Sequence, residues 1–280
     1  MKKIFAILLL ASIITASCGA SSSQNTNLLL VSTTSTQDSG LLDVILPAFT
    51  EKTGYTVQLV AVGSGQALKI GAEGNADVIL LHSPAAEKQF MSDGFGIDRR
   101  LVMHNDFVLV GPPSDPAEIR GKSPVEALEE IFASRVTFVS RGDESGTHVK
   151  ELTLWENTGL EPAGEDWYLE TGQGQGPTLS IASEKAGYAI TDRGTYLTYK
   201  ANVDLEILVE GDPFLLNVYH VITVSPERWP NVNLEGAKAF ADFVTSPEGQ
   251  KIIGEFGMDK YGQQLFIPDA NKTDEELGLP

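Results

Sequence analysis

Short apolar runs alternate with segments of helical spacing along the first part of this 280-residue chain. Residues 28–31 and 76–81 are apolar runs of strand length, and residues 55–62 have the same character. Between them, residues 41–49 and 66–73 carry apolar side chains at the spacing of one helix face. Alternation of this kind is typical of parallel βαβ units, so the sequence predicts an α/β fold.

Two longer apolar stretches divide the chain into two parts. Residues 101–110 (LVMHNDFVLV) end in a Gly-Pro-Pro break, and residues 215–224 (LLNVYHVITV) follow a second α/β section. The first stretch would carry the chain into a second domain, and the second would carry it back. We therefore predict a discontinuous first lobe and a continuous second lobe. Their bounds are residues 27–110 and 217–280 for the first, and 111–216 for the second.

The N-terminus has the features of an export signal. Two lysines precede an apolar run, residues 4–16, which is too short to span a bilayer as a helix but suits a signal peptide. The single cysteine, Cys18, follows two small residues at the expected cleavage point. This favours a lipoprotein signal over residues 1–18, with a polar tether over residues 19–26. The alternative is an ordinary cleaved signal with a chance cysteine. Both predict an extracytoplasmic protein, either periplasmic or lipid-anchored to the cell membrane.

Charge and cysteine content exclude several classes of function. Lys plus Arg is 20 and Asp plus Glu is 38, which gives a net charge of −18. Such a chain repels nucleic acids and anionic membrane surfaces, although a local pocket can still bind a small anion. One cysteine forms no internal disulfide and no multi-cysteine metal site. The acidic tail from Asn271 is expected to pack loosely.

The most informative motif is RGDESGT, residues 141–147, between a predicted strand and a predicted helix. The unpaired N–H groups of a helix N-terminus attract an anion. Arg141 adds a charged fork, Ser145 and Thr147 add hydroxyl donors, and Gly146 allows close approach of the backbone. The alternative is plain helix capping by Asp143 or Ser145, with Arg141 on the surface. Capping alone does not explain the arginine, the glycine and the second hydroxyl.

A run of five hydroxyl residues follows the first predicted strand. It begins with Ser32, Thr33 and Thr34. Ligands of open α/β sheets bind outside the carboxyl ends of strands, so these hydroxyls are candidate donors. The alternative is a capping cluster with Asp38 or Ser39 as the true cap.

Two further hydroxyl residues lie near glycines. Ser64 lies in a Gly-Ser-Gly turn, which lacks the dinucleotide and phosphate-loop signatures and suits a small anion better. Thr178 follows a glycine-rich segment, residues 172–176, which is either a source of N–H groups or only a turn.

The histidines give no sign of catalysis. His82, His104, His148 and His220 are scattered, and neither a His-Glu-x-x-His motif nor a Gly-x-Ser-x-Gly elbow is present. Ser145 and His148 make a weak catalytic pair, and His148 is expected to be a solvated residue of the first helical turn. We predict no catalytic residue, no metal site and no cofactor.

Three stretches of this chain resemble a known family. They are STTSTQDSGLLDVILPAF from Ser32, RGDESGTHVKE from Arg141, and GYAITDRGTYL from Gly187. They are similar to the tungstate-binding proteins of bacterial ABC importers, which are relatives of molybdate- and phosphate-binding periplasmic proteins. The resemblance runs from about Leu28 to Pro268. The family's first loop has three threonines before a serine; here Ser32 takes the first place and retains the hydroxyl.

The resemblance implies a two-lobed α/β fold, the type II periplasmic-binding-protein fold, with mixed sheets, two crossing hinge strands and the ligand between the lobes. It implies a monomeric extracytoplasmic lipoprotein, not an enzyme, that captures tungstate, or else molybdate, and delivers it to an ABC permease and its ATPase. A phosphate-binding protein of the same fold and a secreted hydrolase of anionic substrates are the alternatives. The ligand-binding residues expected on this basis are Ser32, Thr33, Thr34, Ser64, Arg141, Ser145, Gly146, Thr147 and Thr178.

Overall fold

The computed structural model describes residues 25–278, so the export signal and the lipidation candidate Cys18 lie outside the described residues. The strands are β1 (Asn27–Thr33), β2 (Thr56–Val62), β3 (Val78–Leu81), β4 (Gly96–Gly111), β5 (Phe138–Ser140), β6 (Tyr168–Glu170), β7 (Ala189–Asp192), β8 (Glu206–Val209), β9 (Leu216–Val224) and β10 (Ile267–Pro268). The helices are α1 (Thr34–Asp38), α2 (Leu42–Thr53), α3 (Ser64–Ala72), α4 (Pro84–Ser92), α5 (Pro124–Ser134), α6 (Gly146–Thr158), α7 (Gln175–Glu184), α8 (Arg193–Tyr199), α9 (Leu234–Thr245), α10 (Pro247–Glu255) and α11 (Met258–Tyr261). Within this part of the chain, no helix combines the length and the apolar character that crossing a membrane requires.

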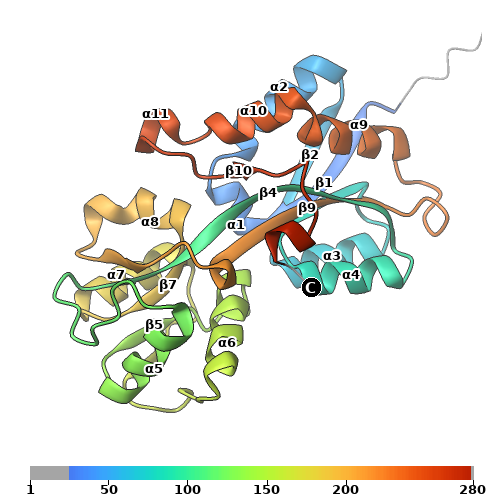
Figure 1. Cartoon of the computed structure of the whole chain (residues 1–280). Coiled ribbons are helices and arrows are strands. Elements are labelled where there is room, and N and C mark those ends of the chain that lie inside the picture. Colours follow the sequence, from blue (N-terminus) through green and yellow to red (C-terminus); the bar gives the residue numbers. More distant parts are fainter. Residues whose placement is uncertain (1–24, 279–280) are drawn as a thin grey trace, which may run out of the picture.

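Strands β1, β2 and β3 form the parallel part of the larger sheet (Figure 1). Leu28 on β1 pairs with Val57 on β2, and Leu30 pairs with Val78 on β3. The predicted βαβ alternation is thus confirmed. Because parallel strands end at the same edge of a sheet, the residues that follow these three strands gather at one place.

Strands β4 and β9 cross from one half of the molecule to the other (Figure 1). They run antiparallel, and their pairing extends from Gly96 opposite Val224 to Asp106 opposite Leu216. β9 also pairs with β3, whereas residues 107–110 of β4 pair with β7. The long strands predicted at residues 101–110 and 215–224 therefore exist, and β4 belongs to both halves.

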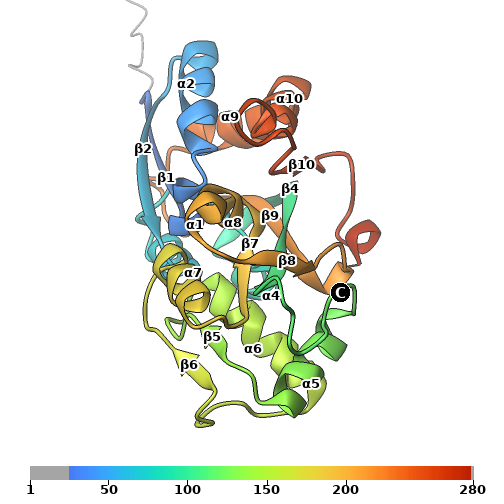
Figure 2. The ribbon, with the colours of Figure 1, turned by 90° about the vertical axis from the view of Figure 1, so that its left-hand side faces the viewer.

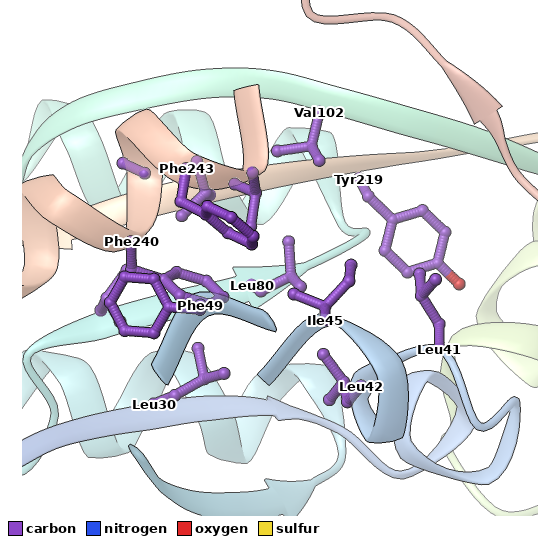
Figure 3. Close-up of a cluster of buried hydrophobic side chains, with 14 of the residues drawn as sticks. Leu30, Leu41, Leu42, Ile45, Phe49, Leu80, Val102, Tyr219, Phe240 and Phe243 are labelled. Carbon is purple, nitrogen blue, oxygen red and sulfur yellow. The ribbon is translucent and has the colours of Figure 1, made fainter. Parts of the chain in front are cut away.

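Alternate residues of β1 pack on opposite faces of the sheet, as expected for a central strand. Leu30 belongs to a buried cluster with Phe49 of α2 and Phe240 of α9, whose rings meet edge-on at 5.3 Å between centroids (Figure 3). Val31 belongs to a second cluster, on the face covered by α3 and α4, with Phe90. Burying each such side chain contributes about 1.5–3 kcal/mol to the stability of the fold, so the clusters on both faces hold the central strand in place.

The second half packs around clusters of its own. Phe138 of β5 meets Trp155 of α6 edge-on at 5.4 Å, and Trp167 lies in the same cluster. The end of β4 contributes Phe107 to this cluster, while Met103 belongs to the first half. The boundary between the two hydrophobic cores therefore lies between residues 103 and 107 of β4, whereas the sequence suggested a lobe boundary at residue 110. Figure 2 shows α5, α6 and α7 on the opposite side of β4 and β9 from α2, α9 and α10.

The C-terminal tail is anchored, so the prediction of loose packing is wrong. Asp274 accepts hydrogen bonds from Nη1 of Arg99 and Nε2 of His220, each at 2.9 Å. Nδ1 of His220 lies 2.9 Å from Oε2 of Glu87, and both of these side chains are fully buried. The acidic tail packs because Asp274 accepts hydrogen bonds from Arg99 and from the buried His220.

Candidate functional site

The hydroxyl run, residues 32–36, spans the end of β1 and the start of helix α1. Thr33 caps α1, because its Oγ1 accepts a hydrogen bond from the backbone N–H of Thr36 at 3.2 Å. The same oxygen lies 2.6 Å from Oγ1 of Thr36. The alternative of a capping cluster is thus confirmed in part, with Thr33 as the cap in place of Asp38 or Ser39.

Ser32 and Thr34 differ in how far they are available to a ligand. Ser32 is fully buried, and its hydroxyl donates to the backbone oxygen of Leu80 at 2.7 Å. Its single hydroxyl hydrogen is therefore engaged within the sheet. Thr34, the first residue of α1, is exposed.

Ser64 begins α3 at the same edge of the sheet. The N-cap residue Gly63 supplies no side-chain bond to this helix. The Oγ of Ser64 is buried and has no hydrogen-bond partner among residues 25–278. An unpaired buried hydroxyl costs about 1–3 kcal/mol, so this oxygen is a candidate ligand donor.

The RGDESGT segment combines capping with a held arginine. Ser145 caps α6 by accepting from the N–H of His148, and Oδ1 of Asp143 accepts from the N–H of Ser145 at 3.2 Å. Arg141 is only 12% exposed, and Oδ2 of Asp143 accepts hydrogen bonds from its guanidinium. The capping alternative is therefore right for Ser145, which caps α6. The same alternative placed Arg141 on the surface, and this is wrong because the side chain is largely buried. The N-terminus of α6, with Gly146 and the buried Thr147, lies beside a fixed cation.

His148 is buried, so the prediction of a solvated ring is wrong. The side chain is 8% exposed, and its Nδ1 accepts a hydrogen bond from the backbone N–H of Glu144 at 3.0 Å. Glu144 has a left-handed backbone, with φ of 57°, which turns its N–H back toward the helix. A neutral ring that accepts at Nδ1 carries its hydrogen on Nε2. That atom has no partner in the described part of the chain.

His82 connects the two sides of the site and was not identified from the sequence. It follows β3 directly, and its Nε2 lies 3.2 Å from both Oγ1 of Thr33 and Oγ of Ser35. Its ring also adjoins Gly146. Burial lowers the pKa of His82 to about 4, although Glu87 opposes this shift, so the ring is neutral at pH 7. Its place after a predicted strand, at the same edge as the hydroxyl groups, was the available signal.

A small cavity of about 10 Å³ lies beside His82, and it has room for about one water molecule. Residues of both halves and of β4 and β9 line it; they include Ser35, His82, Asn105, Thr147, Asp192 and Tyr219. Burial raises the pKa of Asp192, whose two oxygens accept hydrogen bonds from the N–H and hydroxyl of Thr195.

Thr178 lies in α7 behind the site. It is fully buried, and its hydroxyl donates to the backbone oxygen of Gly174 at 3.1 Å. Gln175 is closer to the charged group: its Oε1 faces Nη1 of Arg141 at 3.5 Å, and its amide donates to the oxygen of Ile190. The glycine-rich segment therefore brings Gln175 toward Arg141, a contact that no motif in the sequence indicated.

No group of three or more His, Cys, Asp and Glu side chains within residues 25–278 is arranged to hold a metal ion. The groups gathered here include hydroxyls, the guanidinium of Arg141 paired with Asp143, the ring of His82 and the N-terminus of α6. Such donors suit a ligand whose atoms accept hydrogen bonds, that is, an oxyanion.

Comparison with known proteins gives consistent matches. The family model described as "PBP superfamily domain" matches residues 20–248. The tungstate-binding protein TupA of Peptoclostridium acidaminophilum is 50% identical over 249 residues, which cover 88% of this chain and 87% of the relative. The protein of the same name from Campylobacter jejuni is 45% identical and covers 84% of this chain and 88% of the relative.

Solved structures agree in fold. The tungstate-binding protein TupA from Desulfovibrio alaskensis G20 is 46% identical, with a TM-score of 0.81, over 87% of this chain and 99% of that one. A structure described as the tungstate ABC transporter from Geobacter sulfurreducens is 48% identical, with a TM-score of 0.74, over 82% and 98%. These similarities confirm the predicted fold class, an α/β fold of the type II periplasmic-binding-protein kind.

Proposed function

The chain belongs to the PBP superfamily and, within it, to the family of the TupA tungstate-binding proteins. We propose that it captures tungstate outside the cytoplasm for an ABC importer. The protein binds the oxyanion without changing it chemically. It passes the anion to the permease, whose ATPase drives uptake. Molybdate, which has the same charge and a similar tetrahedral shape, is the nearest competing ligand.

One observation carries this proposal: the ring of His82 lies between the start of α6 and the hydroxyl loop, which comprises residues 33–36 at the end of β1 and the start of α1. His82 is within 3.2 Å of Thr33 and Ser35, and the same ring adjoins Gly146. Donors from the two halves of the molecule therefore face one another. A tetrahedral anion between them would receive hydrogen bonds from several directions, with Arg141 supplying positive charge.

The donors available to this anion are a subset of those expected from the sequence. Ser32 and Thr178 have already engaged their hydroxyl hydrogens, so we leave them out of the proposed set. The proposed ligand-binding residues are Thr33, Thr34, Ser64, Arg141, Ser145, Gly146 and Thr147. The cavity beside His82 is only water-sized, so the anion would lie outside it, at the more accessible members of this set.

The arrangement of carboxylates favours an anion without protons. Tungstate at neutral pH only accepts hydrogen bonds, whereas hydrogen phosphate also needs an acceptor for its proton. Asp77 does not supply this acceptor, because its two oxygens accept from the N–H groups of Leu29 and Asn233, each at 2.7 Å. The remaining candidate, Asp143, is turned toward Arg141.

We propose that the protein acts as a monomer tethered by lipid on Cys18, which lies outside the described residues. Cys18→Ser should release the protein from the membrane fraction or block its processing. A variant that stays membrane-bound at wild-type size and amount would refute the anchor.

Calorimetry of oxyanion-free protein with tungstate, molybdate, phosphate and sulfate in turn tests the ligand. We expect tungstate to bind, and phosphate at a hundredfold excess to leave it bound. Displacement by phosphate at near-equal concentration would support a phosphate-binding protein instead. Turnover of phosphate or sulfate esters would support a hydrolase.

A further inference from the structure

We infer that His82 is a positioning residue of the oxyanion site: its ring sets how closely the start of α6 approaches the hydroxyl loop, and it holds the hydroxyls of Thr33 and Ser35 in place. This inference rests on the proposed function, since it names a residue that arranges the proposed donors without being one of them. Nothing in the sequence motifs assigns such a role to this histidine.

The ring is held on the side of the first half. Its Nε2 lies 3.2 Å from Oγ1 of Thr33 and 3.2 Å from Oγ of Ser35. Its centroid lies 4.7 Å from that of the Tyr219 ring, on the crossing strand β9. Tyr219 is itself buried, so the imidazole cannot move away easily.

The same ring leaves no room for a side chain at the start of α6. A β-carbon on Gly146 would lie 2.8 Å from Cε1 of His82 and 3.5 Å from its Nδ1. Real β-carbons do not approach other atoms as closely as 2.8 Å, so a larger residue would push α6 and the loop apart. Glycine at position 146 and histidine at position 82 therefore fit each other.

The ring acts through shape and hydrogen bonding, not through charge. Burial lowers its pKa to about 4, so at pH 7 it adds no positive charge for a dianion. A neutral imidazole has one donor and one acceptor nitrogen, and Nε2 therefore either accepts from a hydroxyl or donates to one. Either role orients Thr33 and Ser35 relative to α6.

A double-mutant cycle tests this inference, with sodium tungstate as the probe and the full mature chain as the protein. His82→Ala should weaken binding about three- to thirtyfold, because the hydroxyls of Thr33 and Ser35 lose the partner that they share and keep only their contacts with neighbouring hydroxyls. Gly146→Ala should weaken binding at least tenfold, because its methyl group meets the ring. The double variant should bind no more than about threefold worse than His82→Ala, since the ring that caused the clash is absent.

A different role for Gly146 gives a different result. If this glycine serves only to admit the ligand to the backbone, Gly146→Ala should cost the same factor in the presence and in the absence of His82. Such additivity would overturn the inference. Gly174→Ala is the matched control, because Gly174 caps α7 with nothing within 4 Å of an added β-carbon; its affinity should stay within about threefold of wild type.

The same four proteins, without ligand, separate this inference from the proposed function. If tungstate does not bind to the wild-type protein, the proposed function is wrong. The double-mutant cycle then compares the urea concentrations at which wild type, the two single variants and the double variant are half unfolded. We then expect Gly146→Ala to lower the midpoint in the presence of His82 and to have little effect in its absence. Equal shifts in both backgrounds would overturn the inference.

Discussion

Two nitrogens of Arg141 face a single oxygen of Asp143: Nε lies 3.1 Å and Nη2 2.5 Å from Oδ2. The other oxygen of Asp143 accepts from the N–H of Ser145. Burial raises the pKa of Asp143, but Ser145 and Arg141 outweigh this effect, so its pKa lies below the ordinary value and it stays ionised at neutral pH. A carboxylate thus competes with any anion for the arginine.

Asp143→Asn should strengthen tungstate binding. Asparagine keeps an acceptor for Ser145, while the negative charge that holds Arg141 and repels a dianion is lost. The pair is partly exposed, so its removal changes the free energy by about 1 kcal/mol, or roughly three- to tenfold in affinity. Calorimetry measures the affinity for tungstate of Asp143→Asn and of the control variant Glu144→Gln, which removes a neighbouring exposed carboxylate. Binding weakened more than tenfold would mean that Asp143 matters for placing Arg141, and the competition argument would be wrong.

Arg141→Ala should weaken oxyanion binding about 30-fold to several thousandfold. Arg141 and the bound anion would form a buried charge pair. Loss of one partner of such a pair costs about 2–5 kcal/mol, and each 1.4 kcal/mol corresponds to a tenfold change in affinity. Arg141→Lys should recover only part of this, because lysine lacks the planar fork. Melting without ligand should change little, and the rise in melting temperature on adding tungstate should shrink. A change of less than threefold in a folded variant would contradict the placement of the site.

Glu151→Gln should stabilise the protein more as pH rises. Burial raises the pKa of Glu151 from 4.5 to about 7, although the hydroxyl of Tyr168 donates to its Oε1 at 2.6 Å. The folded state therefore holds a proton that the unfolded state has lost, so the stabilisation present below pH 4.5 is lost as pH rises through about 7. Glutamine imitates the protonated form at every pH.

Urea unfolding from pH 5 to pH 8 checks this. The two proteins should be similar at pH 5, and the variant should be more stable at pH 8 by up to about 3 kcal/mol. Glu156→Gln, at an exposed position of the same helix, should show no such trend. A difference that stays constant with pH would show that Glu151 is ionised throughout.

Asp274→Ala should destabilise the fold by about 1–3 kcal/mol, since Nη1 of Arg99 and Nε2 of the buried His220 lose their acceptor, although Glu87 still contacts both side chains. Urea unfolding at pH 7 measures the effect. Glu275→Ala removes an exposed carboxylate from the same tail and should stay within about 0.5 kcal/mol of wild type. Equal effects of the two substitutions would mean that the tail does not contribute through this cluster.

Much of the fold could be predicted because its signals are local. Apolar runs and helical spacing indicated β1, β2 and β3 with the helices between them, and the rule for parallel strands placed the hydroxyl residues at one edge. The tail could not be assigned in this way. Its acidic composition resembles a solvated segment, and only the folded chain brings Asp274 to His220.

The site was less predictable because its contacts are not local. His82 carries no motif, and its approach to Thr33 depends on the register that pairs Ser32 with Leu80. The burial of His148 depends on the left-handed backbone of Glu144, which reverses the preceding loop. The position of His82 directly after a predicted strand was the available signal for that residue, whereas the turn at Glu144 has no signal in residue type or spacing.

Diffraction from crystals grown with tungstate, recorded at the tungsten absorption edge, would locate the bound anion. We expect one strong anomalous peak between the hydroxyl loop and the start of α6. Hydrogen-bonded oxygens would place the metal about 4 Å from the guanidinium nitrogens of Arg141 and from Oγ of Ser64. A peak elsewhere in the molecule, or none at a tungstate concentration that saturates binding in solution, would contradict the account.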